Sequence, residues 1–247
     1  MSSGNHQQNN TVYINCDMGE GMGNDGDIMP YIQCANIACG YHAGDENTMW
    51  QTVELALKNN VSIGAHVSFL DRKNFGRTEM DLPSADIYEL VQQQLILLNE
   101  IAESFDQTIH HVKPHGALYN MSARDAEIAK VIAAAVKDYD PNLILFGLSG
   151  SHSTNEGKKI GLRSASEAFA DRTYQDDGSL TPRSHSNALI DSADEVVKQV
   201  MQLAGKGKVT SINGNTLELQ VDTICIHGDG IHAVEFAQAI HEVLTKQ

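Results

Sequence analysis

The chain has 247 residues, of which 17 are basic and 32 acidic, and its formal net charge is −15. This charge argues against binding to nucleic acid or to an anionic membrane surface, and no apolar stretch approaches the ~20 residues of a membrane-spanning helix. Hydrophobic residues make up 41% of the chain, which is enough for the core of one α/β barrel of this length.

The first ten residues, MSSGNHQQNN, are polar, and we expect residues 1–10 to be disordered. They lack the basic segment and apolar run of a signal peptide. The four cysteines form no C-x-x-C pair and lie in or beside apolar sequence, so we expect no disulfides and a cytoplasmic location. We predict one domain over residues 11–247.

From residue 12 onward, short apolar runs typical of buried strands alternate with amphipathic stretches typical of helices. The expected strands are residues 12–16, 36–39, 61–67, 109–112, 143–148, 161–164 and 223–226. Seven strands with intervening helices predict a parallel α/β sheet, either doubly wound or closed into a barrel.

Helix signals support this alternation. We expect helices from Asp45 to about Asn59, from Ser84 to about Phe105 and from Ile231 to Leu244. Ser122 and Ser192 begin S-x-x-[DE] capping patterns, and Gly205 is suited to end a helix. Residues 171–187 are expected to form a loop, and residues 209–221 a hairpin around Asn213-Gly214.

Three of the expected strands end in two polar residues spaced i, i+2, which places both side chains on one face. The pairs are Asn15 with Asp17, Lys113 with His115, and His227 with Asp229. Packing alone rarely places Asp, Lys and His there, whereas β/α proteins gather catalytic groups at the carboxyl ends of parallel strands. We interpret the pairs as parts of an active site.

The strongest local indication is residues 112–120, VKPHGALYN. Lysines are common on surfaces but not at the inner end of a buried strand. An ammonium beside an imidazole would lower the pKa of both Lys113 and His115, and the pair would suit polarising a carbonyl or holding a carboxylate.

Two glycine-rich segments follow the first two strands. Residues 21–26 match G-x-G-x-x-G, but the neighbouring acids, Glu20 among them, would repel a pyrophosphate, so we favour a flexible loop that brings Asp17 and Glu20 to a site. Residues 36–45 bring Asn36, His42 and Asp45 together. Asp45 is equally well explained as a helix N-cap.

Further candidates lie after the third and sixth strands. His66 ends a strand, and Arg77 follows it; a single histidine there is often structural, but His42 and His115 favour a shared role. Residues 166–174 supply Glu167, Asp171 and Arg172. The last two are expected by default to pair within the loop.

Several known catalytic patterns are absent from the sequence. Residues 150–158 are not a P-loop, and there is no G-x-S-x-G elbow, four-cysteine cluster or H-E-x-x-H motif. Asp17, His42 and His66 could hold a divalent metal, but no local spacing demands one. The metal content is left open.

Taken together, the motifs resemble the LamB/YcsF family over nearly the whole chain after residue 10. They are N-x-D-x-G-E-G, A-N-I-A-C-G-x-H-A-G-D, G-A-H, F-G-R, K-P-H-G-A-L-Y, E-x-F-A-D-R-x-Y and H-G-D. The resemblance implies a single seven-stranded parallel β/α barrel akin to the polysaccharide deacetylase and glycoside hydrolase-like barrels. It also implies a component of an ATP-dependent 5-oxoprolinase, which opens the lactam of 5-oxo-L-proline to give L-glutamate, working with separate B and C subunits.

The chain departs from the family pattern at three places beside proposed site residues. Val67 stands where a proline is usual, Thr78 where a second arginine is usual, and Gly230-Ile231 where [ST]-P is usual. These departures put local substrate contacts in question but leave the reaction class unchanged.

For this chemistry the sequence offers two groups of residues. The catalytic candidates are Asp17, Glu20, His42, Asp45, His66, Lys113, His115, Glu167, His227 and Asp229. The substrate-binding candidates are Asn15, Asn36, Arg77 and Arg172.

The roles within these groups stay partly open. Lys113 and Arg172 would hold the substrate carboxylate or a phosphate. Asp17 or Asp45, oriented by His42 or His66, would activate water, and His115 or His227 would act as general acid. ATP would be bound largely with the partner subunits.

Two alternatives belong to other functional classes. A metal-dependent carbohydrate N-deacetylase would use a similar barrel and would bind a divalent ion tightly. A non-catalytic subunit that only presents substrate to its partners would lose binding, without a selective fall in turnover, when site residues are replaced.

Overall fold

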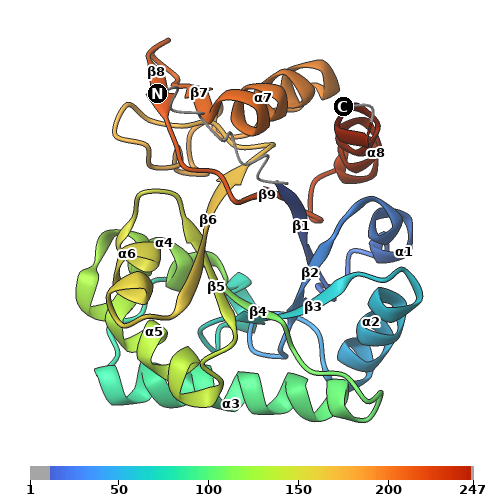
Figure 1. Ribbon diagram of the computed structural model, residues 1–247, viewed down its shortest axis with the longest axis vertical. Coiled ribbons are helices and arrows are strands. Elements are labelled where there is room, and N and C mark those ends of the chain that lie inside the picture. Colours follow the sequence, from blue (N-terminus) through green and yellow to red (C-terminus); the bar gives the residue numbers. More distant parts are fainter. Residues whose placement is uncertain (1–11, 246–247) are drawn as a thin grey trace, which may run out of the picture.

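Seven parallel strands close into a barrel in the order β1-β2-β3-β4-β5-β6-β9 (Figure 1). The protein is seen in a computed structural model that describes residues 12–245, so the disorder expected for residues 1–10 lies outside the described residues. The barrel strands are β1 (Tyr13–Met18), β2 (Cys34–Ala38), β3 (Ser62–Val67), β4 (His111–Pro114), β5 (Ile144–Leu148), β6 (Arg163–Phe169) and β9 (Thr223–Ile226). The predicted seven-stranded β/α barrel is confirmed, in its closed form.

The barrel closes through its last strand. β9 pairs with β1, where Tyr13 lies opposite Thr223, and also with β6, where Glu167 lies opposite the same threonine. The first and last strands of the barrel are therefore neighbours in its wall, and the segments that follow them both contribute to its carboxyl-terminal rim.

Helices cover the outside of the barrel, with α3 along one edge of the molecule and α7 and α8 on the side of β9 (Figure 1). They are α1 (Asp25–Ile28), α2 (Glu46–Lys58), α3 (Ser84–Glu103), α4 (Gly116–Arg124), α5 (Ala126–Tyr139), α6 (His152–Lys159), α7 (Ala193–Lys206) and α8 (Ala233–Thr245), with 3-10 turns η1 (Met29–Tyr31) and η2 (Arg72–Asn74). None of these helices combines the length and apolarity needed to cross a membrane.

The expected hairpin is present as the antiparallel pair β7 (Lys208–Thr210) and β8 (Thr216–Glu218). Several expected boundaries were wrong, because β2 begins two residues earlier and β4 lies two residues later than expected, and three further differences concern caps and a strand end. Helix α5 is capped by Asp125, whose carboxylate accepts the N–H groups of Glu127 and Ile128, while Ser122 lies inside α4. Helix α7 continues to Lys206 and ends at Gly207 in the left-handed conformation, where glycine is favoured. Strand β6 runs to Phe169, beyond the expected residue 164.

The layer between barrel and helices is apolar, but the inside of the barrel is polar. Asn15, Asn36, His111 and Glu167 are each 0% exposed, and Lys113 is 2% exposed. Barrel interiors are usually filled by bulky branched side chains, so a buried polar layer marks a place where function sets the residues.

Candidate active site

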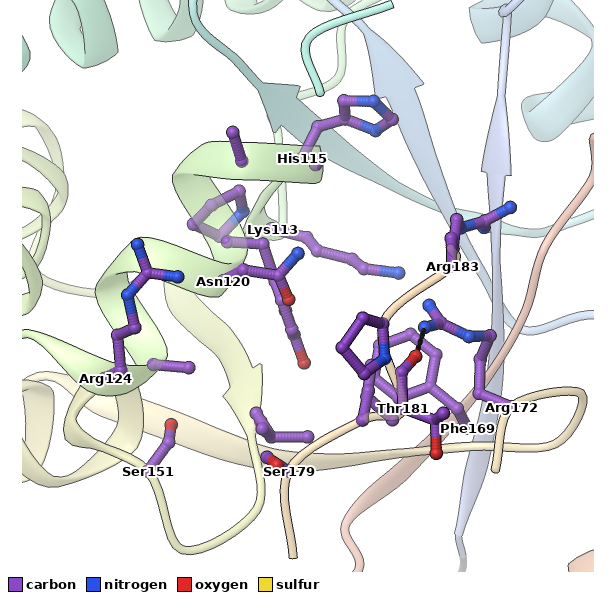
Figure 2. A pocket seen from close by; sticks show the side chains of 18 of the residues that line it. Lys113, His115, Asn120, Arg124, Ser151, Phe169, Arg172, Ser179, Thr181 and Arg183 are labelled. Atoms are coloured by element: carbon purple, nitrogen blue, oxygen red, sulfur yellow. Dashed lines mark hydrogen bonds between the residues drawn. The ribbon is translucent and has the colours of Figure 1, made fainter. Parts of the chain in front are cut away.

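A cavity of about 740 Å³ opens at the carboxyl ends of the barrel strands (Figure 2). The sequence candidates that line it are Asp17, Glu20, His66, Arg77, Lys113, His115, Arg172, His227 and Asp229. They come from segments that follow different strands, as expected for a β/α barrel whose active site is built at this end.

Lys113 extends from β4 into the middle of this cavity (Figure 2). Its Nζ lies 2.8 Å from Asp17 Oδ1, 3.2 Å from Glu167 Oε1 and 3.0 Å from Cys225 Sγ. Although burial alone would lower the pKa of Lys113, the charge of Asp17 raises it well above its usual value, with help from Cys225 and Glu167. The expectation of a lowered lysine pKa was therefore wrong, because carboxylates rather than an imidazole surround the ammonium.

A hydrogen-bonded layer beneath the cavity holds Asp17 and Lys113 in place. The Asn15 amide donates to Glu167 Oε1 at 2.9 Å, and the Asn36 amide donates to Asp17 Oδ1 at 2.9 Å and to Asn15 Oδ1 at 2.7 Å. The structure does not bring Asn15, Asn36 or Glu167 to the cavity wall. They position the groups above them and are not placed to touch a substrate.

His111 belongs to the same layer and was missed in the sequence. Its Nε2 lies 2.9 Å from Asn36 Oδ1, which can only accept, so this nitrogen donates. The sequence contained a signal for it, because residues 111, 113 and 115 are spaced i, i+2 and therefore share one strand face. Only Lys113 and His115 were among the sequence candidates.

Three imidazoles and one carboxylate form a compact cluster above Asp17, which we call the histidine cluster: Glu20, His42, His66 and His115. His42 Nε2 lies 3.0 Å from Glu20 Oε1, and His66 Nε2 lies 2.9 Å from His115 Nδ1. The His42 and His115 rings stack with centroids 3.8 Å apart. The two glycine-rich segments and the strand ends thus bring these candidates together, although His42 lies behind the cavity wall.

Burial dominates the electrostatics of the histidine cluster. It lowers the pKa of His42 to about 2, and together with His66 and His42 it lowers the pKa of His115 well below its usual value. Burial also raises the pKa of the Glu20 carboxyl, assisted by the charge of Asp17. The pKa of Asp17 shifts in the opposite direction. Burial alone would raise this pKa, but His66 and Lys113 lower it.

Gly76 explains how the chain closes over the histidine cluster. It has a φ of +66°, and a Cβ at this position would lie 2.3 Å from Ser68 Oγ and 2.9 Å from His42 Cβ. The neighbouring Phe75 carbonyl lies 2.9 Å from His115 Nε2. Only glycine combines this backbone conformation with so close an approach.

On the opposite side of the cavity, Asp171 orients His227. The His227 Nδ1 lies 2.9 Å from Asp171 Oδ1, and its ring stacks on Phe169 with centroids 5.3 Å apart. Although burial alone would raise the pKa of Asp171, the His227 imidazole lowers it. Asp171 was expected by default to pair within its own loop, and its bond to His227 after the neighbouring strand β9 was not foreseen.

Arg172 and Arg183 lie on the same side, and Arg77 reaches it from the loop after β3. Arg172 Nη2 donates to the Thr181 carbonyl at 2.7 Å, so its guanidinium is held against its own loop (Figure 2). Arg77 pairs with Asp229, and Arg183 Nη1 lies 3.6 Å from the same carboxylate. Arg183 was not among the sequence candidates because nothing in the loop sequence indicates that residue 183 turns back over the barrel.

The structure does not bring Asp45 to the cavity. Its carboxylate accepts the Thr48 N–H and hydroxyl, each at 2.8 Å, at the exposed start of α2. Of the two explanations open for Asp45, the N-cap accounts for its position.

Comparisons with known proteins agree with this geometry. Residues 12–247 match the LamB/YcsF family. Two proteins named as the A subunit of 5-oxoprolinase, from Staphylococcus aureus strains bovine RF122 / ET3-1 and MRSA252, are each 50% identical over 241 residues, covering 96% of this chain and 96% of theirs. The crystal structure of the lactam utilization protein from Thermus thermophilus is 38% identical, with a TM-score of 0.89 and 96% of each chain covered. The chain belongs to the LamB/YcsF family.

Proposed function

We propose that this chain is the A subunit of a 5-oxoprolinase, which opens the lactam of 5-oxo-L-proline to L-glutamate at the expense of ATP. The observation that carries the proposal is the 50% identity, over 96% of both chains, to the staphylococcal proteins that bear this name. The polar cavity at the barrel mouth supports it, since hydrolysis of a cyclic amide needs positioned acids, bases and cations.

The reaction makes three demands on the site. A lactam is a poor electrophile, so its oxygen must be activated, and ATP can do this by phosphorylation. Water must then attack the ring carbon, and the ring nitrogen must receive a proton as the C–N bond breaks; a second water then hydrolyses the resulting acyl phosphate, which releases inorganic phosphate and gives the glutamate carboxylate.

Asp17 and His227 are the groups best placed to handle water and proton. Asp17 faces the cavity and is fixed by Lys113 and by the Asn36 amide, which both donate to its Oδ1. We assign Asp17 to hold the attacking water. His227, whose Nδ1 is bound by Asp171, is left with Nε2 for the ring nitrogen, and we assign it as general acid.

Cations of the cavity would bind the substrate's negative groups. Lys113 is neutralised by two carboxylates, so we assign it to polarise the lactam oxygen or its phosphate and not to hold the substrate carboxylate alone. We assign Arg183, whose side chain is 31% exposed, to bind the carboxylate of the substrate, with Arg172 behind it in the cavity wall.

We infer that B and C subunits complete the enzyme and carry much of the ATP chemistry. The sequence has no P-loop, and the cavity is far larger than a five-membered lactam needs, which leaves room for a phosphorylated intermediate. We also propose a cytoplasmic location, supported by four cysteines that are all buried and free.

The test is glutamate release from 5-oxo-L-proline and ATP, measured with this chain alone and then with B and C subunits. We expect glutamate only in the full mixture. Folded subunits that release none in any mixture would contradict the proposal, and acetate release from an N-acetylated sugar would then support the deacetylase. Full turnover with both Asp17→Asn and His227→Gln chains would instead support a subunit that only presents substrate.

A further inference from the structure

The histidine cluster contains two ring nitrogens that face each other and that, in neutral rings, have no hydrogen between them. His66 Nδ1 lies 2.9 Å from the Lys113 carbonyl oxygen, and His115 Nε2 lies 2.9 Å from the Phe75 carbonyl oxygen. A carbonyl oxygen only accepts, so each of these nitrogens must carry the hydrogen. In a neutral ring the other nitrogen then presents a lone pair.

Those two lone pairs converge. His66 Nε2 and His115 Nδ1 are 2.9 Å apart, a hydrogen-bond distance, yet in the neutral tautomers neither can donate to the other. Both belong to buried rings, with His66 1% and His115 6% exposed. Facing acceptors at this distance repel, so the arrangement calls for a positive species between them.

A carboxylate completes the convergence. Glu20 Oε1 lies 3.5 Å from His115 Nδ1 and 3.8 Å from His66 Nε2. Around a tetrahedral zinc ion with ligands at about 2.0–2.1 Å, neighbouring ligand atoms are about 3.3 Å apart. The three separations in the histidine cluster lie on either side of that value.

The surroundings match those of a metal site. A ligand histidine normally donates its second N–H to a carbonyl or carboxylate, as both rings do here. His42 Nε2 lies 3.0 Å from the same Glu20 Oε1 and fixes the position of that carboxylate. Glu20, His66 and His115 all line the cavity, whereas His42 does not, so one coordination position would face the substrate space.

We propose that Glu20, His66 and His115 bind one divalent transition-metal ion, with His42 orienting Glu20. Two imidazoles with one carboxylate favour an ion such as zinc over magnesium, which prefers oxygen ligands alone. A bound ion of this kind would supply a water of lowered pKa at the cavity. The inference goes beyond the proposed reaction, and a metal ion is equally compatible with the deacetylase, so the substrate assay and not chelation decides between those two activities.

The test needs neither substrate nor partner subunits. The purified full-length chain is stripped with chelator, titrated with cobalt(II), and followed by its visible absorption and by metal analysis after dialysis. We expect one equivalent to be bound, with the intense absorption of a four- or five-coordinate ion. We expect this to be lost in His66→Gln and His115→Gln proteins and kept in His185→Gln, a matched change at an exposed loop histidine.

Folding of each variant is checked by circular dichroism. If a variant does not fold, X-ray absorption of the zinc-loaded wild-type chain still counts the imidazole ligands, for which we expect two. Folded wild-type protein that takes up no metal would leave a shared proton as the positive species and would overturn the proposal. Uptake unchanged by both cluster substitutions would overturn it as well.

Discussion

The two walls of the cavity differ in how far water reaches them. The first wall, formed by the ends of β1 to β4, includes Lys113 and His66, with side chains 3% and 1% exposed. The second wall, formed by the loops after β6 and β9, includes His227 and Arg183, with side chains 14% and 31% exposed. Charges interact strongly where water is excluded, so the first wall holds a fixed arrangement, while the second can adjust to a ligand.

Breaking the first wall should have the largest effect. Lys113→Ala leaves Asp17 and Glu167 buried without their cation, and removing one partner of a buried pair costs about 3–5 kcal/mol. We expect the free energy of unfolding, measured with urea, to fall by that amount and glutamate release to disappear.

Lys58→Ala is the matched control on the surface, since it removes an exposed pair with Glu54 in α2. Such pairs contribute about 0.3–0.5 kcal/mol. Equal losses in the free energy of unfolding for the two variants would mean that burial of the Lys113 pair does not increase its contribution to stability.

The second wall should respond in turnover and not in stability. His227→Gln removes the proposed general acid but keeps a polar side chain of similar size, and we expect kcat of the complete enzyme to fall by about 10²–10⁴-fold with unfolding little changed. Asp171→Asn should lower kcat through the same histidine. In the double variant the two losses should not add, because both act on one proton transfer. Additive losses in kcat would show that Asp171 does not act through His227.

Gly76→Ala should damage the first wall without removing a functional group. An alanine must adopt a φ near +66° and crowd Ser68 and His42. Gly214→Ala in the β7–β8 hairpin is the control, because its φ is +83° but a Cβ there meets no heavy atom within 4 Å. The backbone cost of about 1–2 kcal/mol is common to both, so we expect the melting temperature to fall further for Gly76→Ala. Equal decreases in melting temperature would show that the loop over the histidine cluster moves to accommodate the added Cβ at little cost.

The smallest effect is expected at the rim of the second wall. Arg183→Ala removes a partly exposed cation, while Asp229 keeps its pair with Arg77. We expect KM for 5-oxo-L-proline to rise on the order of tenfold, the value of one hydrogen bond to a charged group, with kcat nearly unchanged. A fall in kcat alone would place Arg183 in the chemical step.

The strand and helix alternation could be predicted from sequence because apolar runs and caps are local signals. The end of β6 could not. Residues Ser164, Ser166 and Glu167 look like loop sequence, yet Glu167 points into a barrel whose interior is polar and pairs there with Lys113. A strand that buries a charge gives no alternating apolar signal until its distant partner is known.

Many residues of the candidate site could be predicted individually from the sequence, but their arrangement into two walls could not. Spacing along one strand indicated Lys113 with His115, since i and i+2 share a face. The contact of His66 with His115, and of Asp171 with His227, joins residues far apart in the sequence, and only the closed barrel sets those distances. Asp45 was ambiguous for the opposite reason, since an aspartate before a helix is explained by local capping alone.

The pairing of Tyr13 with Thr223 also bears on how the protein is made. Asp17 emerges from the ribosome long before His227, and neither wall faces the other until β9 inserts between β6 and β1. Contacts between such distant positions form slowly because the chain must first lose the entropy of a long loop. A nascent chain interrupted before β9 would carry all the groups of the first wall and still be unable to catalyse, so the activity of this barrel reports that synthesis has passed β9.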